Sequence, residues 1–158
     1  MSTNYWLTTH YPHPGDQSVD WNIYLQREKR SPSREPLPGD RVLFFELQSA
    51  KQVVGASRIP KGERRIVALA TVVGPFQERS PDRAVVRYAD GSIVDWAWEA
   101  PCADHNFIGR VEYQDVNRIL GLPDQATMFG FGSGSGLGLL GESQFQELSS
   151  IFQSHRRE

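Results

Sequence analysis

Short blocks of hydrophobic residues, separated by turns rich in proline and glycine, predict the main strands of this chain. Residues 4–10 (NYWLTTH) are rich in aromatic and β-branched residues and predict a short strand. Residues 40–47 (DRVLFFEL) and 65–73 (RIVALATVV) are nearly continuous apolar runs. Such runs are typical of strands that are covered on both faces.

Residues 84–98 (AVVRYADGSIVDWAW) predict a β-hairpin. Its centre contains Asp90-Gly91, a dipeptide that suits a two-residue turn. Trp96 and Trp98 are two residues apart in the second half of this segment, so we expect them to share one face of a strand.

Two helices are predicted between these strands. The first begins near Trp21, where Ser18 or Asp20 could cap it, and the three prolines of residues 31–39 end it. The second begins near residue 111 and ends at Gly121, because glycine is favoured just after a helix and a proline follows two residues later.

The last 30 residues combine a glycine-rich segment with a third predicted helix. Residues 129–141 (FGFGSGSGLGLLG) are expected to be flexible because of their composition. Residues 142–158 predict a helix, since Phe145, Leu148 and Phe152 recur at spacings of three and four.

The order of these elements predicts an α+β fold in which a mixed sheet of about five to six strands curls into a small barrel with helices packed against it. A length of 158 residues is typical of one domain. We therefore expect a folded domain over residues 1–125, a glycine-rich linker or loop over 126–141, and a C-terminal helix over 142–158.

Composition predicts a protein in water. Hydrophobic residues make up 39% and charged residues 23% of the chain, as in globular proteins. No apolar run approaches the roughly 20 residues of a membrane span, and the N-terminus lacks the pattern of a secretory signal. A single cysteine, Cys102, leaves no internal disulfide. We expect a cytoplasmic protein with no membrane partner.

Charge is unevenly distributed along the chain. Residues 27–65 contain ten of the 17 lysines and arginines but only five acids, although the whole chain carries a net charge of −2. This pattern indicates either a basic face that attracts a polyanion or a pair of solvated loops.

Motifs for catalysis, metals or cofactors are weak. Gly136–Gly141 matches G-x-G-x-x-G, but a dinucleotide fold needs a following strand and acid that the remaining 17 residues do not provide. His10 and His13 share a turn without a third metal ligand near them. Cys102 is read as a small hydrophobic residue. We predict no metal, no cofactor and no catalytic residue.

Aromatic residues are the stronger signal. Eight of them gather near predicted strand ends and around the first loop: Tyr5, Trp6, Tyr11, Trp21, Tyr24, Phe76, Trp96 and Trp98. Most should be core, but two or three could line a pocket in which a base stacks between rings.

Four segments in this order and spacing resemble the EVE domain family. They are NYWLTTHYP, WNIYLQREKR, PGDRVLFFEL and RIVALATVVGPF, and the likeness covers residues 4 to about 76. The most characteristic motifs are Asn4-Tyr5-Trp6-Leu7 and Gly39-Asp40 before a strand with two phenylalanines. The resemblance implies a PUA-like mixed β-barrel, related to the YTH readers of methylated adenine in RNA.

The resemblance further implies a module that reads a modified base flipped out of a nucleic acid. Trp21 would stack on the base, and the backbone and amide of Asn22 would meet its hydrogen-bonding edge. The other implied pocket residues are His10 and Tyr24 as walls, Thr9 in the opening loop, and one of Phe76, Trp96 or Trp98 as the opposing face. A flipped base loses stacking and pairing worth a few kcal/mol, which these contacts must offset.

Phosphate contacts would supply further affinity and make binding dependent on salt. The implied residues are Arg27, Lys29, Arg30, Arg64 and Arg65. We expect DNA to be favoured over RNA, with 5-methylcytosine or 5-hydroxymethylcytosine as the base. An effector nuclease domain, as in modification-dependent restriction enzymes, or a homodimer through the C-terminal helix are the implied protein partners.

Three alternatives remain open at the level of sequence. The same pocket could read a modified RNA base such as methyladenine or a tRNA base. The protein could be a small-molecule enzyme that uses His10 or Cys102. It could also be an interaction domain whose glycine-rich segment and last helix dock a partner.

Overall fold

A computed structural model describes residues 3–11, 21–48, 53–55, 61–128, 131–132 and 134–155. These residues form strands and helices in the α+β arrangement expected from the sequence. The strands are β1 (Tyr5–His10), β2 (Ile23–Leu25), β3 (Arg41–Glu46), β4 (Arg65–Val72), β5 (Gln77–Glu78), β6 (Val85–Arg87), β7 (Ile93–Asp95), β8 (Trp98–Ala100), β9 (Cys102–Asn106), β10 (Val111–Glu112) and β11 (Leu137–Leu140). The helices are η1 (Arg27–Lys29, a 3-10 helix), α1 (Pro81–Ala84), α2 (Tyr113–Leu120) and α3 (Glu142–Ser154).

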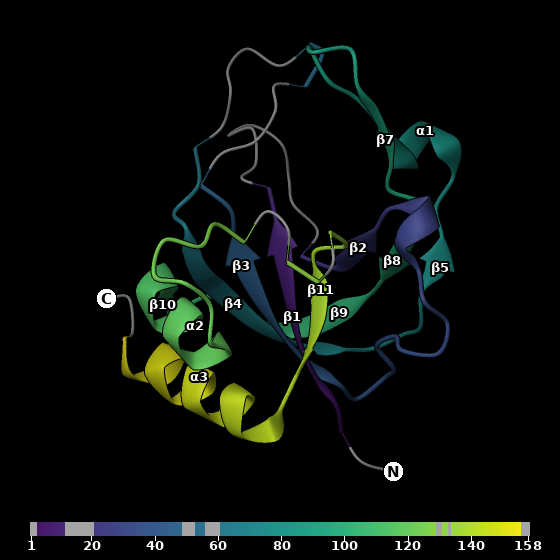
Figure 1. The fold of residues 1–158 in the computed structure, drawn as a ribbon. Helices are drawn as coiled ribbons and strands as arrows, with labels where there is room; N and C mark the ends of the chain where they lie inside the picture. The colour runs from purple at the N-terminus through teal and green to yellow at the C-terminus, as the bar shows by residue number, and fades with distance from the viewer. Residues whose placement is uncertain are drawn as a thin grey trace.

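The principal sheet has six strands and is open. Its order is β10-β4-β3-β1-β11, with β9 also paired to β4. β1 runs parallel to β3, and every other pair in this sheet is antiparallel. Two smaller sheets, β2-β8-β5 and β6-β7, lie beside it (Figure 1). Among the described strands the pairing path does not return to its start, so the expected closed barrel is not formed.

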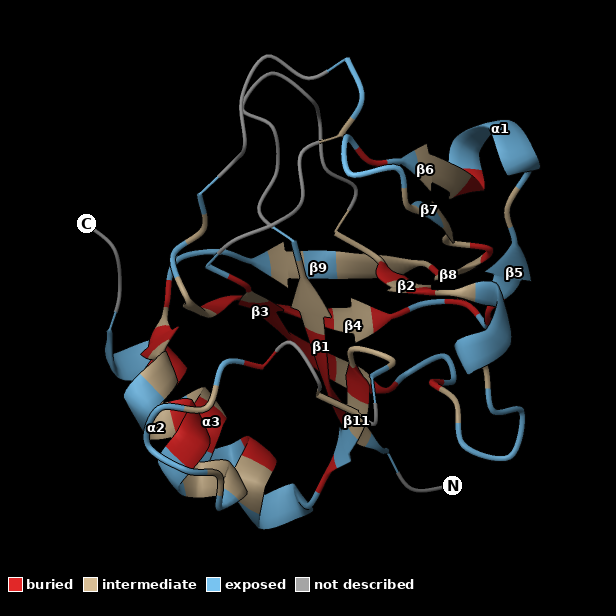
Figure 2. Ribbon diagram, turned by 45° about the horizontal axis from the view of Figure 1, so that its top comes forward, coloured by how far each residue is buried: buried red, intermediate tan, exposed pale blue. Residues whose placement is uncertain are grey.

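Two hydrophobic cores lie on the two faces of the principal sheet, because successive side chains of a strand point to opposite faces. Leu7, Leu43 and Phe45 belong to the core under α2 and α3. Trp6, Val42 and Phe44 belong to the core under the β2-β8-β5 sheet. Burial on both faces explains the continuous apolar runs in β3 and β4 and confirms that expectation (Figure 2).

The prediction of a helix that begins near Trp21 is wrong. After Trp21 and Asn22 the chain forms the short strand β2, and the only helical residues before the prolines are the three of η1. Ile23 and Leu25 are buried and Tyr24 is half-buried, which is the period of a strand. β2 pairs antiparallel with β8, about 75 residues further along the chain, so tertiary pairing overrides the local helical pattern.

The predicted hairpin is confirmed as β6 and β7, but its turn is longer than expected. Tyr88 N donates to Ser92 O, which leaves a three-residue loop whose last member, Gly91, has a φ of 90°. This is the hairpin type in which a left-handed glycine follows a type I turn. The expectation that Trp96 and Trp98 share one strand is wrong, because β7 ends at Asp95 and β8 begins at Trp98.

The C-terminal third belongs to the same folded unit as the rest. The predicted helices are confirmed as α2, with Gly121 left-handed at its end, and α3, which buries Phe145, Leu148 and Phe152. Residues 137–140, expected within a flexible linker, instead form β11, which pairs with β1. Leu137 and Leu140 are buried, and this apolar contribution to the core outweighs the flexibility of the neighbouring glycines.

Candidate functional site

A cluster of rings lies where β1 ends and β2 begins. His10 stacks on Trp21, with ring centroids 5.3 Å apart and planes 7° apart. Phe44 of β3 meets His10 and Trp21 edge-on, at 5.2 Å and 5.7 Å. Phe107, just after β9, contacts Trp21 at 5.6 Å and stacks on His105 at 5.7 Å. We call these five rings the Trp21 cluster.

Two histidines hold the main chain at Trp21. His10 Nε2 lies 2.9 Å from Asn22 O, and His105 Nε2 lies 2.6 Å from Trp21 O. A carbonyl oxygen can only accept a hydrogen bond, so each Nε2 must carry a proton and donate it. β1 and β9 therefore each hold one of two consecutive carbonyl groups, and together they fix the main chain that carries the half-buried indole.

The side chain of Asn22 is used within the protein. Its Oδ1 accepts a hydrogen bond from Cys102 N at 2.9 Å, and its Nδ2 donates to Glu99 Oε2 at 2.9 Å. Both ends of the amide thus join the start of β2 to β8 and β9. In this arrangement the amide positions Trp21, whereas the sequence predicted that it meets the edge of a base.

A charged pair supports the other side of the cluster. The guanidinium of Arg79 lies 4.9 Å from the ring centroid of Tyr24, whose ring is 5.8 Å from that of His10. Arg79 also donates to Trp96 O at 3.1 Å and lies 4.0 Å from Glu99. Glu99 therefore connects Arg79 with Asn22, and both ends of this chain of contacts reach the Trp21 cluster.

The remaining predicted pocket residues make other contacts, although Phe76 and Trp98 pack in the same core as Trp21 and Phe44. Phe76 is only 6% exposed and belongs to the core beneath β2 and β8. Trp96 meets Tyr11 edge-on at 6.3 Å, and Trp98 lies under Arg30 and donates to Arg27 O. Thr9 N donates to Gly136 O. The structure brings together His10, Trp21, Asn22 and Tyr24 from the prediction. The predicted loop at Pro12 and His13 lies outside the described residues.

Most of the predicted phosphate-binding residues already contact groups of the protein. Arg27 pairs with Glu78 and Asp95, each at 2.7 Å, and its hydrogen bonds to Asp95 and then Glu78 raise its pKa. Arg30 pairs with Glu35, and Arg65 with Glu63 and Glu112. The last two predicted residues differ: Arg64 stacks on Tyr113 at 3.6 Å, and Lys29 is exposed with no ion pair to any described residue.

The spacing of the rings limits how a base could bind. Two aromatic planes that enclose a third ring are about 7 Å apart, twice the contact distance of carbon atoms. His10 and Trp21 are 5.3 Å apart at their centroids, so they contact each other and leave no slot between them. A base could stack only on the indole face opposite His10.

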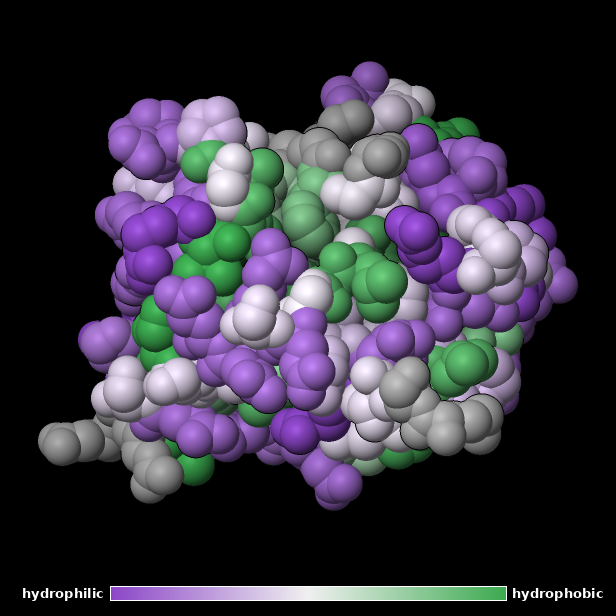
Figure 3. Space-filling view, turned by 60° about the horizontal axis from the view of Figure 1, so that its bottom comes forward, coloured by the Kyte–Doolittle hydropathy of each residue, from purple (hydrophilic) through white to green (hydrophobic). Residues whose placement is uncertain are grey.

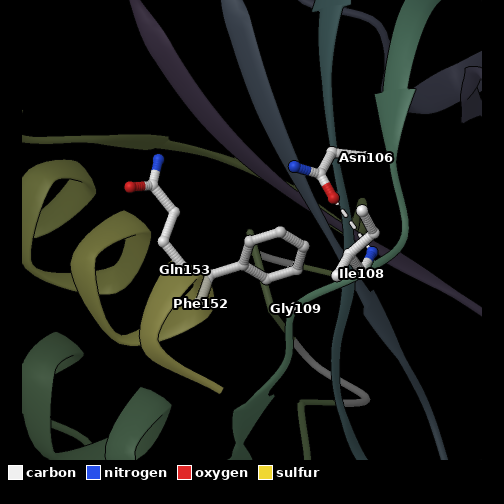
Figure 4. A pocket seen from close by; sticks show the side chains of 5 residues that line it. All are labelled: Asn106, Ile108, Gly109, Phe152 and Gln153. Carbon is white, nitrogen blue, oxygen red and sulfur yellow. Dashed lines mark hydrogen bonds between the residues drawn. The ribbon is translucent and has the colours of Figure 1, made fainter. Parts of the chain in front are cut away.

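Among the described residues, a small and open pocket lies beside the Trp21 cluster. It has a volume of about 280 Å³ and is lined by Asn106, Ile108, Gly109, Phe152 and Gln153 (Figure 4). None of the predicted base-pocket residues lines it. It lies instead between the turn that follows β9 and the last turn of α3.

Three rings of the cluster escaped the sequence prediction. Sequence patterns place Phe44 only in a buried strand, and His105 belongs to no motif that they single out. Phe107 and Ile108 form an apolar pair between Asn106 and Gly109, and this placement between turn-forming residues is a usable signal for an exposed turn. Only the pairing of β9 with β4 brings His105 and Phe107 to Trp21.

The described residues show neither an activated thiol nucleophile nor a metal-binding group. Burial raises the pKa of the Cys102 thiol to about 12, so this thiol is not a thiolate nucleophile at neutral pH. Among the described residues no group of three or more histidines, cysteines and acids is arranged to hold a metal ion. No described helix combines the length and the apolar character needed to cross a membrane.

Comparison with known proteins adds no relative: no protein-family model matches the chain, and no curated protein matches its sequence.

Proposed function

We propose that this protein is a non-catalytic module that binds nucleic acid and reads a modified base flipped out of the strand. The base would stack on the face of Trp21 that His10 leaves uncovered. The observation that carries the proposal is the way Trp21 is held: a half-buried indole fixed at its main chain by two imidazoles and surrounded by rings. A pre-positioned ring loses little conformational entropy when it binds a ligand.

The sequence motifs support a PUA-like fold of the EVE type. The carboxylate of Asp40 accepts hydrogen bonds from Asn4 N at 3.0 Å and Trp6 Nε1 at 2.9 Å. The two most characteristic motifs, Asn4-Tyr5-Trp6-Leu7 and Gly39-Asp40, thus form one structural unit. Asp40 gives the two motifs a shared structural role.

The favoured ligand is a DNA strand that contains 5-methylcytosine or 5-hydroxymethylcytosine. Burial of one methyl group contributes about 1 kcal/mol, which discriminates between bases but cannot alone offset the cost of flipping. Stacking must therefore supply most of the affinity. Because Arg27, Arg30 and Arg65 are paired with carboxylates, a phosphate must compete with those acids, and we expect the salt dependence of binding to be modest.

A binding panel of matched oligonucleotides tests this proposal. The panel contains plain, methylated and hydroxymethylated cytosine in DNA, single-stranded and duplex, and a methyladenine RNA. We expect at least one modified strand to bind more tightly than its plain counterpart. Trp21→Ala should weaken that binding roughly 10- to 100-fold, the effect of losing one stacking contact.

Phe131→Ala is the matched control, because it removes a half-buried ring that packs on the α3 side of the principal sheet. It should leave the preference unchanged. Equal affinity for every strand, or a preference that survives Trp21→Ala, would refute the proposal. A preference found only for the RNA would assign the same ring to an RNA base.

A further inference from the structure

An exposed hydrophobic turn lies directly beside the Trp21 cluster. Phe107 is 42% exposed and Ile108 is 53% exposed, and they follow each other between β9 and β10. Both are large apolar side chains that a folded protein usually covers. We call residues 106–109 the wedge turn.

The wedge turn is held firmly on both sides. Asn106 Oδ1 accepts a hydrogen bond from Ile108 N at 2.9 Å, which closes a tight local turn. Figure 4 shows this bond and the ring of Phe152 beside the turn. Gly109 is buried, and a Cβ placed on it would lie 2.0 Å from Phe152 O. The turn is thus anchored on α3, while Phe107 stacks on His105.

Exposed hydrophobic residues also occur elsewhere, including Leu37, Val73 and Leu139. Figure 3, which brings forward the lower end of the molecule in Figure 1, shows several such areas separated by polar residues. What distinguishes the wedge turn is its contact with Trp21, 5.6 Å from Phe107, together with its rigid anchoring. No other exposed apolar pair of the described residues adjoins the Trp21 cluster through such a ring contact.

We propose that the wedge turn enters the base stack of a DNA duplex at the position that the flipped base leaves. Proteins that unstack DNA commonly insert a phenylalanine, leucine, isoleucine or methionine between bases, which offsets the lost stacking. Ile108 is the side chain that inserts between the bases, and Phe107 lies between Ile108 and the base that stacks on Trp21. The proposal rests on the proposed function.

The size of the turn favours this occupant over a protein partner. A stable protein interface covers about 800 Å² on each side, which needs many residues. Two adjacent apolar side chains on a narrow turn instead match one step between neighbouring bases. Arg110 follows the turn with its side chain half-exposed and its Nε 3.5 Å from Glu112 Oε1, and it is the cation nearest in sequence to the turn that could contact a phosphate.

The role of a wedge predicts a difference between duplex and single-stranded DNA. A single strand has no paired stack to open, so the wedge contributes nothing there. Ile108→Ser should weaken binding to the modified duplex roughly 10- to 100-fold, since unstacking costs a few kcal/mol. The same variant should bind the modified single strand within about twofold of the unchanged protein. A 2-aminopurine next to the target base should fluoresce less with Ile108→Ser, because the stack stays closed.

Val73→Ser is the matched control, because Val73 is 52% exposed and follows β4 at the end of the sheet opposite His10. It should change neither affinity. Equal effects of Ile108→Ser on duplex and single strand, or no effect on either, would overturn the wedge. Loss of a dimer in light scattering, with duplex affinity unchanged, would also overturn it and assign the turn to self-association.

The two proposals fail in different ways. If the unchanged protein shows no preference for modified single strands, the proposed reading of a base fails. If that preference is present but Ile108→Ser has no selective effect on duplexes, only the wedge fails. Duplex binding without any base preference, weakened by Ile108→Ser, would keep the wedge and reject the reader.

Discussion

At the scale of single residues, Asp40 shows how one buried carboxylate joins two parts of the chain through three hydrogen bonds. It is 4% exposed and accepts hydrogen bonds from Asn4 N, Trp6 Nε1 and Leu37 N. A carboxylate in such surroundings must be fully bonded, because an unpaired buried charge is very costly. It therefore fixes the start of β1 against the turn that precedes β3.

Removal of this carboxylate should destabilise the protein strongly. Asp40→Ala leaves three donors without their acceptor, and we expect a loss of about 3 kcal/mol in the free energy of unfolding. Urea denaturation measures this loss, with Asp82→Ala, an exposed acid of α1, as the control. In a double-mutant cycle with Trp6→Phe the two losses should not add, because the substitutions share one hydrogen bond. Strict additivity would show that the indole contact contributes little.

At the scale of elements, the sequence predicts best what depends on near neighbours. β1, β3, β4 and the two longer helices follow from runs and spacings that are read within about ten residues. The prediction for β2 is wrong because its three residues pair with β8, which lies far along the chain. The ion pairs of Arg27 are not predicted for the same reason. Glu78 and Asp95 are brought to Arg27 by strands that periodicity alone does not place.

The candidate site divides along the same line. His10, Trp21 and Tyr24 lie within 15 residues of one another, and the resemblance to EVE domains implies all three as pocket residues. Phe44, His105 and Phe107 join them only when β3 and β9 are placed in the principal sheet. A ring cluster made by long-range pairing is predicted only in part, because no local pattern marks the partner.

The contact between α3 and the wedge turn gives a prediction at this scale. A methyl group on Gly109 would collide with the main chain of Phe152, so α3 or the turn must move. Overpacking of this kind costs about 1–3 kcal/mol, and Gly109→Ala should lower the free energy of unfolding by that amount. Gly121→Ala, whose added methyl group meets open space at a φ of 72°, shows the cost of backbone strain alone. A loss in Gly109→Ala well below about 1 kcal/mol would mean that the close contact is readily relieved.

At the scale of the whole molecule, the two cores make the first and last segments interdependent. β1 lies between β3 and β11, so the N-terminal strand is paired on both edges only when the C-terminal part is present. α3 covers the core that contains Leu7, Leu43 and Ile66. The glycine-rich segment and last helix are thus part of the structure that holds β1, and through it His10, in place.

Truncation after residue 141 should therefore unfold the protein rather than remove an accessory tail. It removes Phe145, Leu148 and Phe152 from the core, and each such side chain contributes about 1.5–3 kcal/mol when it is buried. Their sum approaches the total stability of a small domain, about 5–15 kcal/mol. Circular dichroism during heating should show no cooperative transition for residues 1–141 and a sharp one for residues 1–158. A cooperative transition in the short chain would mean that β3, β11 and the β2-β8-β5 sheet hold β1 and the Trp21 cluster without α3. Loss of nucleic-acid binding in that chain could then be assigned to the tail itself.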